Sequence, residues 1–422
     1  MKVTGIICEY NPLHNGHIYH MKKTRENGAT HLVAVMSGNY VQRGDIAVED
    51  KFERAKLAVR SGIDLVLELP CVYSLSSAEF YARGAVHILN SLGCVDELSF
   101  GSEVGSVEEL SKAAEMIAGF RKDSELEELM RGGMSYPNAV NSLIYKKYGS
   151  KLGNRIGDIL SSPNNVLAVE YIKALRASNS IITPFTIQRK SVAHDSMTAL
   201  GNTASASFIR KCMEEGTDFF GLVPDRVYDS YRKSVQKGSR ASIKNLERLI
   251  IYKLRTSTAE QLRMIPDVGQ GLENRILECA PLRSIDDVLQ NIKTKRYTMA
   301  RIKRILLNLL IGITKSDLEI LPPYVRVLAS SERGKDVLAM AKEKAKLPVA
   351  PSLAKLASCG GDAERFARLE AAASDIYALS QDRIGKGQSD YRNMFTIEGS
   401  SEEDLRKAEE LEELGEFFDD EV

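Results

Sequence analysis

Two histidines near the start of the chain belong to the hexapeptide Pro-Leu-His-Asn-Gly-His, residues 12–17. His14 and His17 are three residues apart, so both face one way if a helix starts near Gly16. A helix N-terminus offers free backbone N–H groups and positive dipole charge, and a glycine lets a phosphate approach the backbone. Imidazole N–H groups there would stabilise charge developing on phosphates during adenylyl transfer. The hexapeptide therefore predicts a nucleotide-binding site with His14 and His17 as catalytic residues and no protein nucleophile.

Two other interpretations of these residues stay open from the motif alone. Asn15-Gly16 also favours a hairpin turn. His14, His17 and His20 could ligate zinc, but no carboxylate or cysteine cluster accompanies them, and we expect no metal site. We interpret His20 as a structural neighbour of His17. The remaining histidines are also interpreted as structural: His31, His87 and His194.

A second segment with phosphate-binding chemistry is Ala-Ser-Ala-Ser-Phe-Ile-Arg at 204–210. Its small hydroxyl residues could open a helix and bring Ser205, Ser207 and Arg210 to phosphate oxygens. By itself the segment indicates a capped helix start. Together with the hexapeptide it becomes a more specific signal. Two further cations, Lys51 and Arg54, are weaker candidates for phosphate contact.

The elements that must position these residues alternate through the first hundred residues. Four continuous apolar runs are typical of buried strands: 2–8, 31–37, 64–70 and 95–101. Helical patterns separate them, at 16–27, 48–62 and 76–93. This order predicts a parallel α/β sheet of Rossmann-like type. The hexapeptide follows the first strand, so it lies at the carboxyl edge of the sheet, where ligands bind in such folds.

The rest of the chain has a mostly helical pattern. A strand is expected at 182–190, and helices continue to about residue 390. The segment from Glu398 to Val422 holds twelve acidic residues against two basic ones, which indicates a solvated tail. We therefore predict a nucleotide-binding catalytic domain at 1–220, a helical basic region at 221–395 and an acidic tail at 396–422.

The composition narrows the class of protein further. Lysine plus arginine and aspartate plus glutamate both total 57, so any nucleic-acid surface must be local. Six cysteines are scattered without a Cys-x-x-Cys pair, which favours reduced thiols and a cytoplasmic location. The longest apolar run, 305–313, is far shorter than the roughly 20 residues of a membrane span, so no membrane partner is expected.

Longer motifs carry a resemblance to a known family. Six stretches resemble, in the expected order, the bacterial tRNA(Met) cytidine acetate ligases within the HIGH-motif nucleotidyltransferase superfamily: GIICEYNPLHNGHIYH, MSGNYVQRGDIA, LELPCVYSLSSAEFYARGAV, LSFGSE, SSPNNVLAVEYIKAL and KRYTMARIKRILLNLLIGI. The resemblance runs from about residue 1 to about residue 390 and does not cover the acidic tail. The hydroxyl segment departs from the superfamily pattern, because Ala206 replaces a hydroxyl residue and Ser207 stands where threonine is common.

The resemblance implies an enzyme that converts ATP and acetate to acetyl-adenylate and then acetylates N4 of the wobble cytidine of elongator tRNA(Met). ATP would be a substrate, and Mg²⁺ is compatible with triphosphate chemistry although no carboxylate cage is visible. Oligomeric state is not addressed by the motifs. The resemblance implies ATP contacts at Ile7, Cys8, Glu9, Tyr10, Asn11, Pro12, Leu13, His14, Asn15, Gly16, His17, Ile18, Tyr19, His20, Gly101, Asn164 and Arg189.

Two basic stretches are the candidates for RNA contact. Residues 230–255 carry eight basic residues and one acidic residue, and residues 293–304 carry six basic residues and no acidic one. Phosphate neutralisation by such clusters gives salt-dependent affinity, and a tyrosine can stack on an unpaired base. The alternative is two cationic helical faces whose apolar sides pack in the core. The tRNA-binding candidates are Lys295, Arg296, Tyr297, Arg301 and Arg304.

Two rival functions fit part of the sequence. A small-metabolite adenylyl- or cytidylyltransferase would use the same hexapeptide but does not need the large helical region with its basic stretches. An RNA-binding protein with a vestigial nucleotide pocket would not need intact His14, Gly16, His17 and Arg210.

Overall fold

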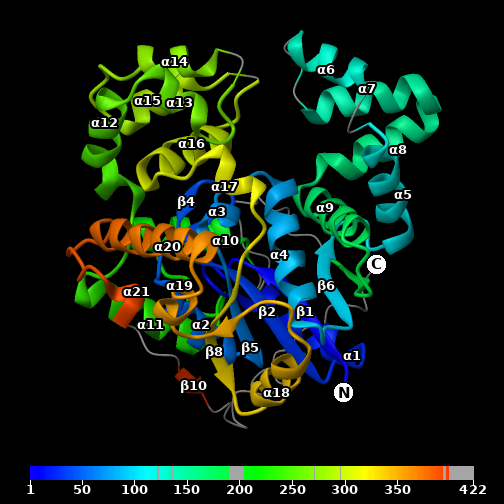
Figure 1. Ribbon diagram of the computed structural model, residues 1–422, viewed down its shortest axis with the longest axis vertical. Coiled ribbons are helices and arrows are strands. Elements are labelled where there is room, and N and C mark those ends of the chain that lie inside the picture. The colour runs from blue at the N-terminus through cyan, green and yellow to red at the C-terminus, as the bar shows by residue number, and fades with distance from the viewer. Residues whose placement is uncertain are drawn as a thin grey trace.

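A twisted sheet lies at the centre of the computed structural model, which describes residues 1–120, 123–132, 134, 136–189, 204–269, 271–294, 296–392 and 396–398. Within these ranges the sheet has the strand order β10-β8-β5-β2-β1-β6-β7, with β9 paired to β8 (Figure 1). Its strands are β1 Val3–Cys8, β2 His31–Ser37, β5 Leu65–Leu69, β6 Glu97–Ser102, β7 Thr183–Gln188, β8 Val325–Ser331, β9 Val349–Ala350 and β10 Thr396–Glu398. A separate hairpin joins β3 Tyr40–Val41 to β4 Asp45–Ile46.

The strand order places the first loop at a functional position. Strands β5, β2, β1, β6 and β7 run parallel. β2 and β5 lie on one side of β1, whereas β6 and β7 lie on the other, so the direction of winding reverses at β1 and β6. Ligands of open α/β sheets bind at such a switch point, outside the carboxyl ends of the strands. The predicted parallel α/β sheet and the position of the hexapeptide at its carboxyl edge are confirmed.

Helices connect and cover the strands (Figure 1). Those before residue 180 are α1 Asn15–Glu26, α2 Lys51–Arg60, α3 Cys71–Ser74, α4 Ala78–Leu92, α5 Val107–Ala118, α6 Ser124–Arg131, α7 Tyr136–Tyr148, α8 Ser150–Ser161 and α9 Pro163–Ala177. Those after residue 200 are α10 Ala206–Glu215, α11 Asp225–Lys237, η1 Ile243–Leu246, α12 Glu247–Thr256, α13 Ala259–Met264, α14 Leu272–Glu278, α15 Ile285–Ile292, α16 Met299–Ile311, α17 Lys315–Glu319, α18 Gly334–Lys344, α19 Leu353–Ala357, α20 Gly361–Leu379 and α21 Ser389–Arg392. None of the helices in the described ranges could cross a bilayer.

The two faces of the sheet bury different cores, because successive strand residues point to opposite sides. On β1, Val3 belongs to the larger core, which includes α4 and the helical region, and Ile6 belongs to the smaller core around α1, α2 and α10. Gly5 lies between them, where a Cβ would come within 2.8 Å of Leu89 in α4. The first strand is therefore packed tightly on both faces, and this packing fixes where its carboxyl end emerges.

The C-terminal region returns to the sheet, which the sequence analysis did not anticipate. β8 pairs antiparallel with β5, and β10 pairs parallel with β8. The predicted helical character of residues 221–395 holds for most of that region, including α12–α16. The boundary at residue 220 does not divide the sheet from the rest of the chain, because residues 325–331 and 396–398 supply two of its strands. Acidic-tail residues after 398 lie outside the described residues.

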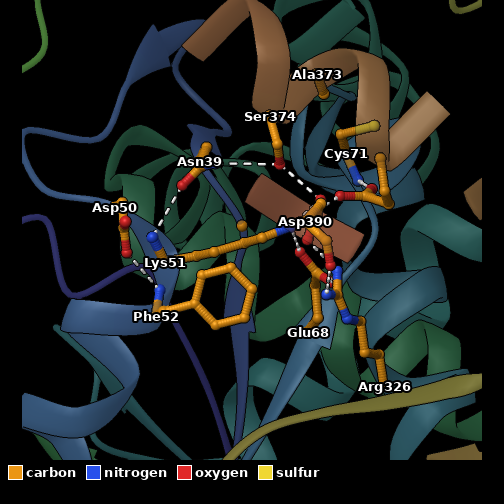
Figure 2. A network of polar contacts seen from close by, with 12 residues as sticks. Asn39, Asp50, Lys51, Phe52, Glu68, Cys71, Arg326, Ala373, Ser374 and Asp390 are labelled. Carbon is orange, nitrogen blue, oxygen red and sulfur yellow. Dashed lines mark hydrogen bonds and ion pairs between the residues drawn. The ribbon is translucent and has the colours of Figure 1, made fainter. Parts of the chain in front are cut away.

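A buried ionic network joins the returning segment to the first domain (Figure 2). Lys51 of α2 and Arg326 of β8 are both 1% exposed, and they share the carboxylates of Glu68 in β5 and Asp390 in α21. The Lys51 Nζ lies 2.8 Å from Asp390 Oδ2, and an Arg326 nitrogen lies 2.6 Å from Asp390 Oδ1. Burial, followed by the charge of Glu68, raises the pKa of the adjoining Glu370 carboxyl to about 8. With Glu370 protonated, two cations balance two carboxylates.

Replacing Lys51 with methionine should lower the free energy of unfolding by about 3–5 kcal/mol, because buried carboxylates then lose one of their two cations. Chemical denaturation followed by circular dichroism at pH 7 measures the difference. Lys335→Met is the matched control, since Lys335 is half exposed and pairs with the exposed Glu332. Its effect should stay below about 1 kcal/mol. Equal stability of the two variants would contradict a stabilising role for the network.

Candidate active site

The two motif histidines form a compact pair at the start of α1. His14 is the residue that caps the helix, with extended backbone angles, and His17 is the third helical residue. The backbone N–H of His14 donates to Nδ1 of His17 at 3.1 Å, and the two rings stack with centroids 3.7 Å apart. Because Nδ1 of His17 accepts a hydrogen bond, a neutral His17 carries its proton on Nε2. The pair therefore presents His17 Nε2–H as a donor at the start of α1.

Gly16 has a packing role that differs from the predicted one. The hexapeptide predicts that Gly16 allows the close approach of a phosphate. A Cβ on Gly16 would lie 3.0 Å from Cε1 and 3.1 Å from Nδ1 of the His14 imidazole. The glycine therefore leaves room first for the His14 ring, which in turn stacks on His17.

The rest of the first loop is held from three directions. Arg54 of α2 donates to the carbonyl of Glu9 at 2.6 Å, and the Val48 N–H donates to Oδ1 of Asn11 at 3.0 Å. Arg210 donates to the carbonyl of Asn11 at 2.7 Å. Tyr10 has a left-handed backbone conformation, with φ at 46°, and its ring lies nearly perpendicular to that of His17, with centroids 4.9 Å apart. These contacts fix the path of the loop between β1 and α1.

The predicted ATP contacts at residues 7–20 belong to a strand end, a loop and a helix start. Ile7 and Cys8 end β1, Glu9 to Leu13 form the loop, and Asn15 to His20 lie in α1. Asn15 binds the segment before α11, since its Nδ2 donates to the Gly221 carbonyl at 2.8 Å. Tyr19 is exposed, and His20 hydrogen-bonds Ser99 at 2.9 Å. Burial, followed by the charge of Arg189, lowers the pKa of His20 to about 4, so His20 is neutral at pH 7 and has the predicted structural role.

The segment 204–210 lies against the first loop, as expected if the two motifs form one site. Ser205 caps α10 and accepts the Phe208 N–H at 3.1 Å, which confirms the predicted capped helix start. One guanidinium nitrogen of Arg210 lies 3.3 Å from the Ser207 hydroxyl, while the other binds Asn11. Residues 199 positions apart thus meet at one end of the sheet. Residues 190–203, including His194, lie outside the described residues.

The other predicted nucleotide contacts gather at β6 and β7. Gly101 lies inside β6, and a Cβ there would come within 3.3 Å of the Arg189 side chain. Asn164 donates to Glu103 at 2.6 Å, whereas Asn165 accepts the Glu103 N–H at 2.9 Å. The residue before α9 is Ser162, which occupies the capping position, so neither asparagine caps this helix. Both asparagines instead tie the start of α9 to the loop after β6.

Lys51 and Arg54 are buried, so their weaker assignment as phosphate contacts is wrong. Lys51 belongs to the ionic network described above. Arg54 is 2% exposed and donates to backbone carbonyls of both loops at the carboxyl edge, including Glu9 and Ser37. This positioning role was not predicted from the sequence. Charged residues early in a helix are usually exposed, so the sequence held no signal for it.

The basic stretch 293–304 is largely occupied by contacts within the protein. Arg304 is 8% exposed and pairs with Asp267 at 2.7 Å, and one of its nitrogens donates to the Gln42 carbonyl at 3.3 Å. Arg301 donates to the Asp267 carbonyl, and Tyr297 is also 8% exposed, beneath Arg301 and Arg296. The burial of Tyr297 and Arg304 argues against direct RNA contact by their side chains. Lys295 lies outside the described residues. RNA binding by the stretch stays a prediction.

The described part of the chain contains no group of three or more metal-ligating side chains. It does contain donors suited to phosphate and an arginine held against the same loop. This combination fits nucleotide chemistry that proceeds without a covalent protein intermediate.

Comparison with known proteins agrees with this interpretation. The HIGH Nucleotidyl Transferase family profile matches residues 1–391. The fold and site thus define the chain as a HIGH-motif nucleotidyltransferase. The tRNA(Met) cytidine acetate ligase of Thermoanaerobacter sp. (strain X514) is 39% identical over 90% of this chain and 96% of its own length. That of Caldanaerobacter subterraneus subsp. tengcongensis is 38% identical over 93% and 98%. The chain belongs to the tRNA(Met) cytidine acetate ligase family.

Solved structures give the same result for the fold. Thermotoga maritima TmcAL bound with alpha-thio ATP superposes with a TM-score of 0.86 and 30% sequence identity, covering 94% of this chain and all of that chain. The apo form of the same protein gives a TM-score of 0.88 over the same shares.

Substituting Gly16 with alanine should displace the His14 ring, because the new methyl group would come within 3.0 Å of it. We expect at least a tenfold loss in the rate of adenylate formation and little change in melting temperature. Gly28→Ala, at the far end of α1, has nothing within 4 Å of the new carbon, although its positive φ adds some strain. That variant should keep its catalytic rate, and a Gly16→Ala enzyme with normal turnover would contradict the packing role.

Proposed function

We propose that this protein is an ATP-dependent ligase that activates acetate as acetyl-adenylate and transfers the acetyl group to N4 of the wobble cytidine of elongator tRNA(Met). The observation that carries the proposal is the His14–His17 pair at a helix N-terminus, at the switch point of the sheet. Membership of the family supplies the acceptor and the acid. A cytoplasmic location follows from a tRNA substrate.

In the first half-reaction an acetate oxygen attacks the α-phosphorus of ATP. The new P–O bond forms as the bond to the bridging oxygen of pyrophosphate breaks. His17 Nε2–H, together with the positive end of the α1 dipole, stabilises charge on the phosphate oxygens, and the ring of His14 holds His17 in place. Ser207 and Arg210 are proposed as further phosphate contacts, since Arg210 already lies against the loop.

The remaining ATP contacts are proposed along the β6 side. Gly101, Asn164 and Arg189 adjoin one another through Glu103 and the strand pairing. Because Gly101 has no side chain, the Arg189 side chain lies against it, and the adenine is proposed to pack beside that side chain. The phosphates of ATP can themselves hold Mg²⁺, so the proposal needs no protein carboxylate cage.

Acetate-dependent exchange of labelled pyrophosphate into ATP tests the activation step. We expect exchange with acetate and only background exchange without it. After incubation with ATP, acetate and tRNA(Met), mass spectrometry should find N4-acetylcytidine at the wobble position. Exchange that ignores acetate would favour a small-metabolite transferase, and RNA binding without any exchange would favour a vestigial pocket.

His17→Ala should reduce acetate-dependent exchange about 100-fold or more, because removing one donor to developing charge costs about 3–4 kcal/mol in comparable sites. The melting temperature and the affinity for tRNA should remain close to those of the unmodified protein. His87→Asn, in the middle of α4, is the control and should leave exchange unchanged. Normal exchange in His17→Ala would rule out the assigned donor role.

A further inference from the structure

Glu9 lies at the centre of the carboxyl edge and has no role of its own in the mechanism above. It follows β1 directly and continues the alternation of that strand. Its side chain therefore points to the same face as Val3 and Ile7, which pack against the core on the α4 side. Its charge acts on Tyr81 of α4 and on Tyr171 of α9. Glu9 therefore faces the side of the sheet away from α1, while its backbone leads directly into the loop that carries the histidines.

The carboxylate of Glu9 is held by one oxygen. Oε1 accepts the backbone N–H of Gln42 at 2.8 Å. Gln42 lies in the β3–β4 hairpin, and its carbonyl accepts from Arg304 of α16. The backbone carbonyl of Glu9 is fixed by Arg54. Among the described residues no hydrogen bond reaches the second oxygen, Oε2, so the group is oriented yet still has an acceptor to offer.

Other carboxylates at this edge are already committed. Asp45 of β4 pairs with Lys303 at 3.2 Å and also accepts the Ile46 N–H. Glu103 accepts from Asn164 and from the Asn165 N–H. His17 uses Nδ1 as an acceptor within the motif, so its remaining nitrogen is a donor. Of these three carboxylates, Glu9 is the one with an oxygen that no hydrogen bond from the described residues reaches.

The surroundings of Glu9 make it a stronger base than an ordinary glutamate. Burial raises the pKa of its carboxyl, while the Gln42 N–H and then the charges of Arg210, Arg43 and Arg54 oppose the rise. The charged and titratable groups around it are those three arginines together with Cys8, Tyr81 and Tyr171. A general base works best when its pKa lies near the working pH.

Acetyl transfer to an exocyclic amine requires such a base. The N4 lone pair forms a bond to the acetyl carbon, the bond from that carbon to the AMP phosphate oxygen breaks, and N4 must lose one proton. Resting on the proposed function, we infer that Glu9 accepts this proton through Oε2 and later releases it to solvent. The products are the N4-acetylated base and AMP, with one proton released. The same oxygen can accept a hydrogen bond from the cytosine amine, which is how carboxylates recognise cytosine.

Measuring the two half-reactions separately tests this assignment. Acetate-dependent pyrophosphate exchange reports adenylate formation, and rapid mixing of preformed enzyme-bound acetyl-adenylate with tRNA(Met) reports transfer in a single turnover. Glu9→Gln keeps the shape and the Gln42 contact but removes the base. We expect transfer to fall about 100- to 10,000-fold, with a much smaller loss in exchange, and the acidic limb of the transfer pH profile to disappear. Glu9→Asp should restore part of the rate and the limb.

Glu26→Gln, the same change at the far end of α1, is the matched control because Glu26 is exposed and pairs with Lys23. It should keep wild-type rates and the pH profile of transfer. Equal losses of exchange and transfer in Glu9→Gln would overturn the proposal in favour of a role in ATP binding. Undiminished transfer with the acidic limb intact would also overturn it, and would assign the proton to the adenylate phosphate. If Glu9→Gln does not fold, the pH profile of Glu9→Asp decides between these outcomes. Absence of acetate-dependent exchange in the unmodified enzyme would instead refute the proposed function.

Discussion

One buried guanidinium fixes both loops that border the candidate site. Arg54 donates to the carbonyls of Glu9, Ser37, Gly38 and Glu49, which belong to the ends of β1 and β2 and to the start of α2. These bonds are charge-assisted, and burying an unpaired cation costs several kcal/mol. A shift in either loop would leave donors of Arg54 without acceptors. The path of the loop before His14 and the path of the loop before Gln42 are therefore set together.

Helix α2 links this positioning to the C-terminal part of the chain. Lys51 and Arg54 are one turn apart on that helix, so they lie on neighbouring parts of its surface. Arg54 serves the loops, whereas Lys51 meets Asp390 and Glu68. Asn39, in the loop after β2, accepts the Lys51 N–H at 2.8 Å and reaches Ser374 of α20 (Figure 2). The described C-terminal helices thus support the same loops.

The sequence could predict the elements whose signals are local. Alternating apolar strands and helices indicated the parallel sheet, and the spacing of His14 and His17 indicated their pairing at a helix start. β8 escaped prediction because Arg326 interrupts its apolar run and because its partner, β5, lies more than 250 residues away in sequence. Lys51, Arg54 and Arg304 were expected at the surface, since charged side chains are seldom buried unless they are paired. Their partners come from distant segments, and no local pattern encodes that pairing.

The antiparallel pairing of β8 with β5 has a consequence for biosynthesis. Until residues 325–331 leave the ribosome, β5 is the edge of the growing sheet, with a row of unpaired backbone groups next to Glu68. Edge strands of this kind are templates for aggregation, and contacts between distant residues slow folding. The ionic network beside this pairing is complete only when Lys51 meets Asp390, 339 positions later. The nucleotide-binding half must therefore wait for nearly the whole chain, and a nascent chain that stalls near residue 220 would present an open sheet edge to the cell.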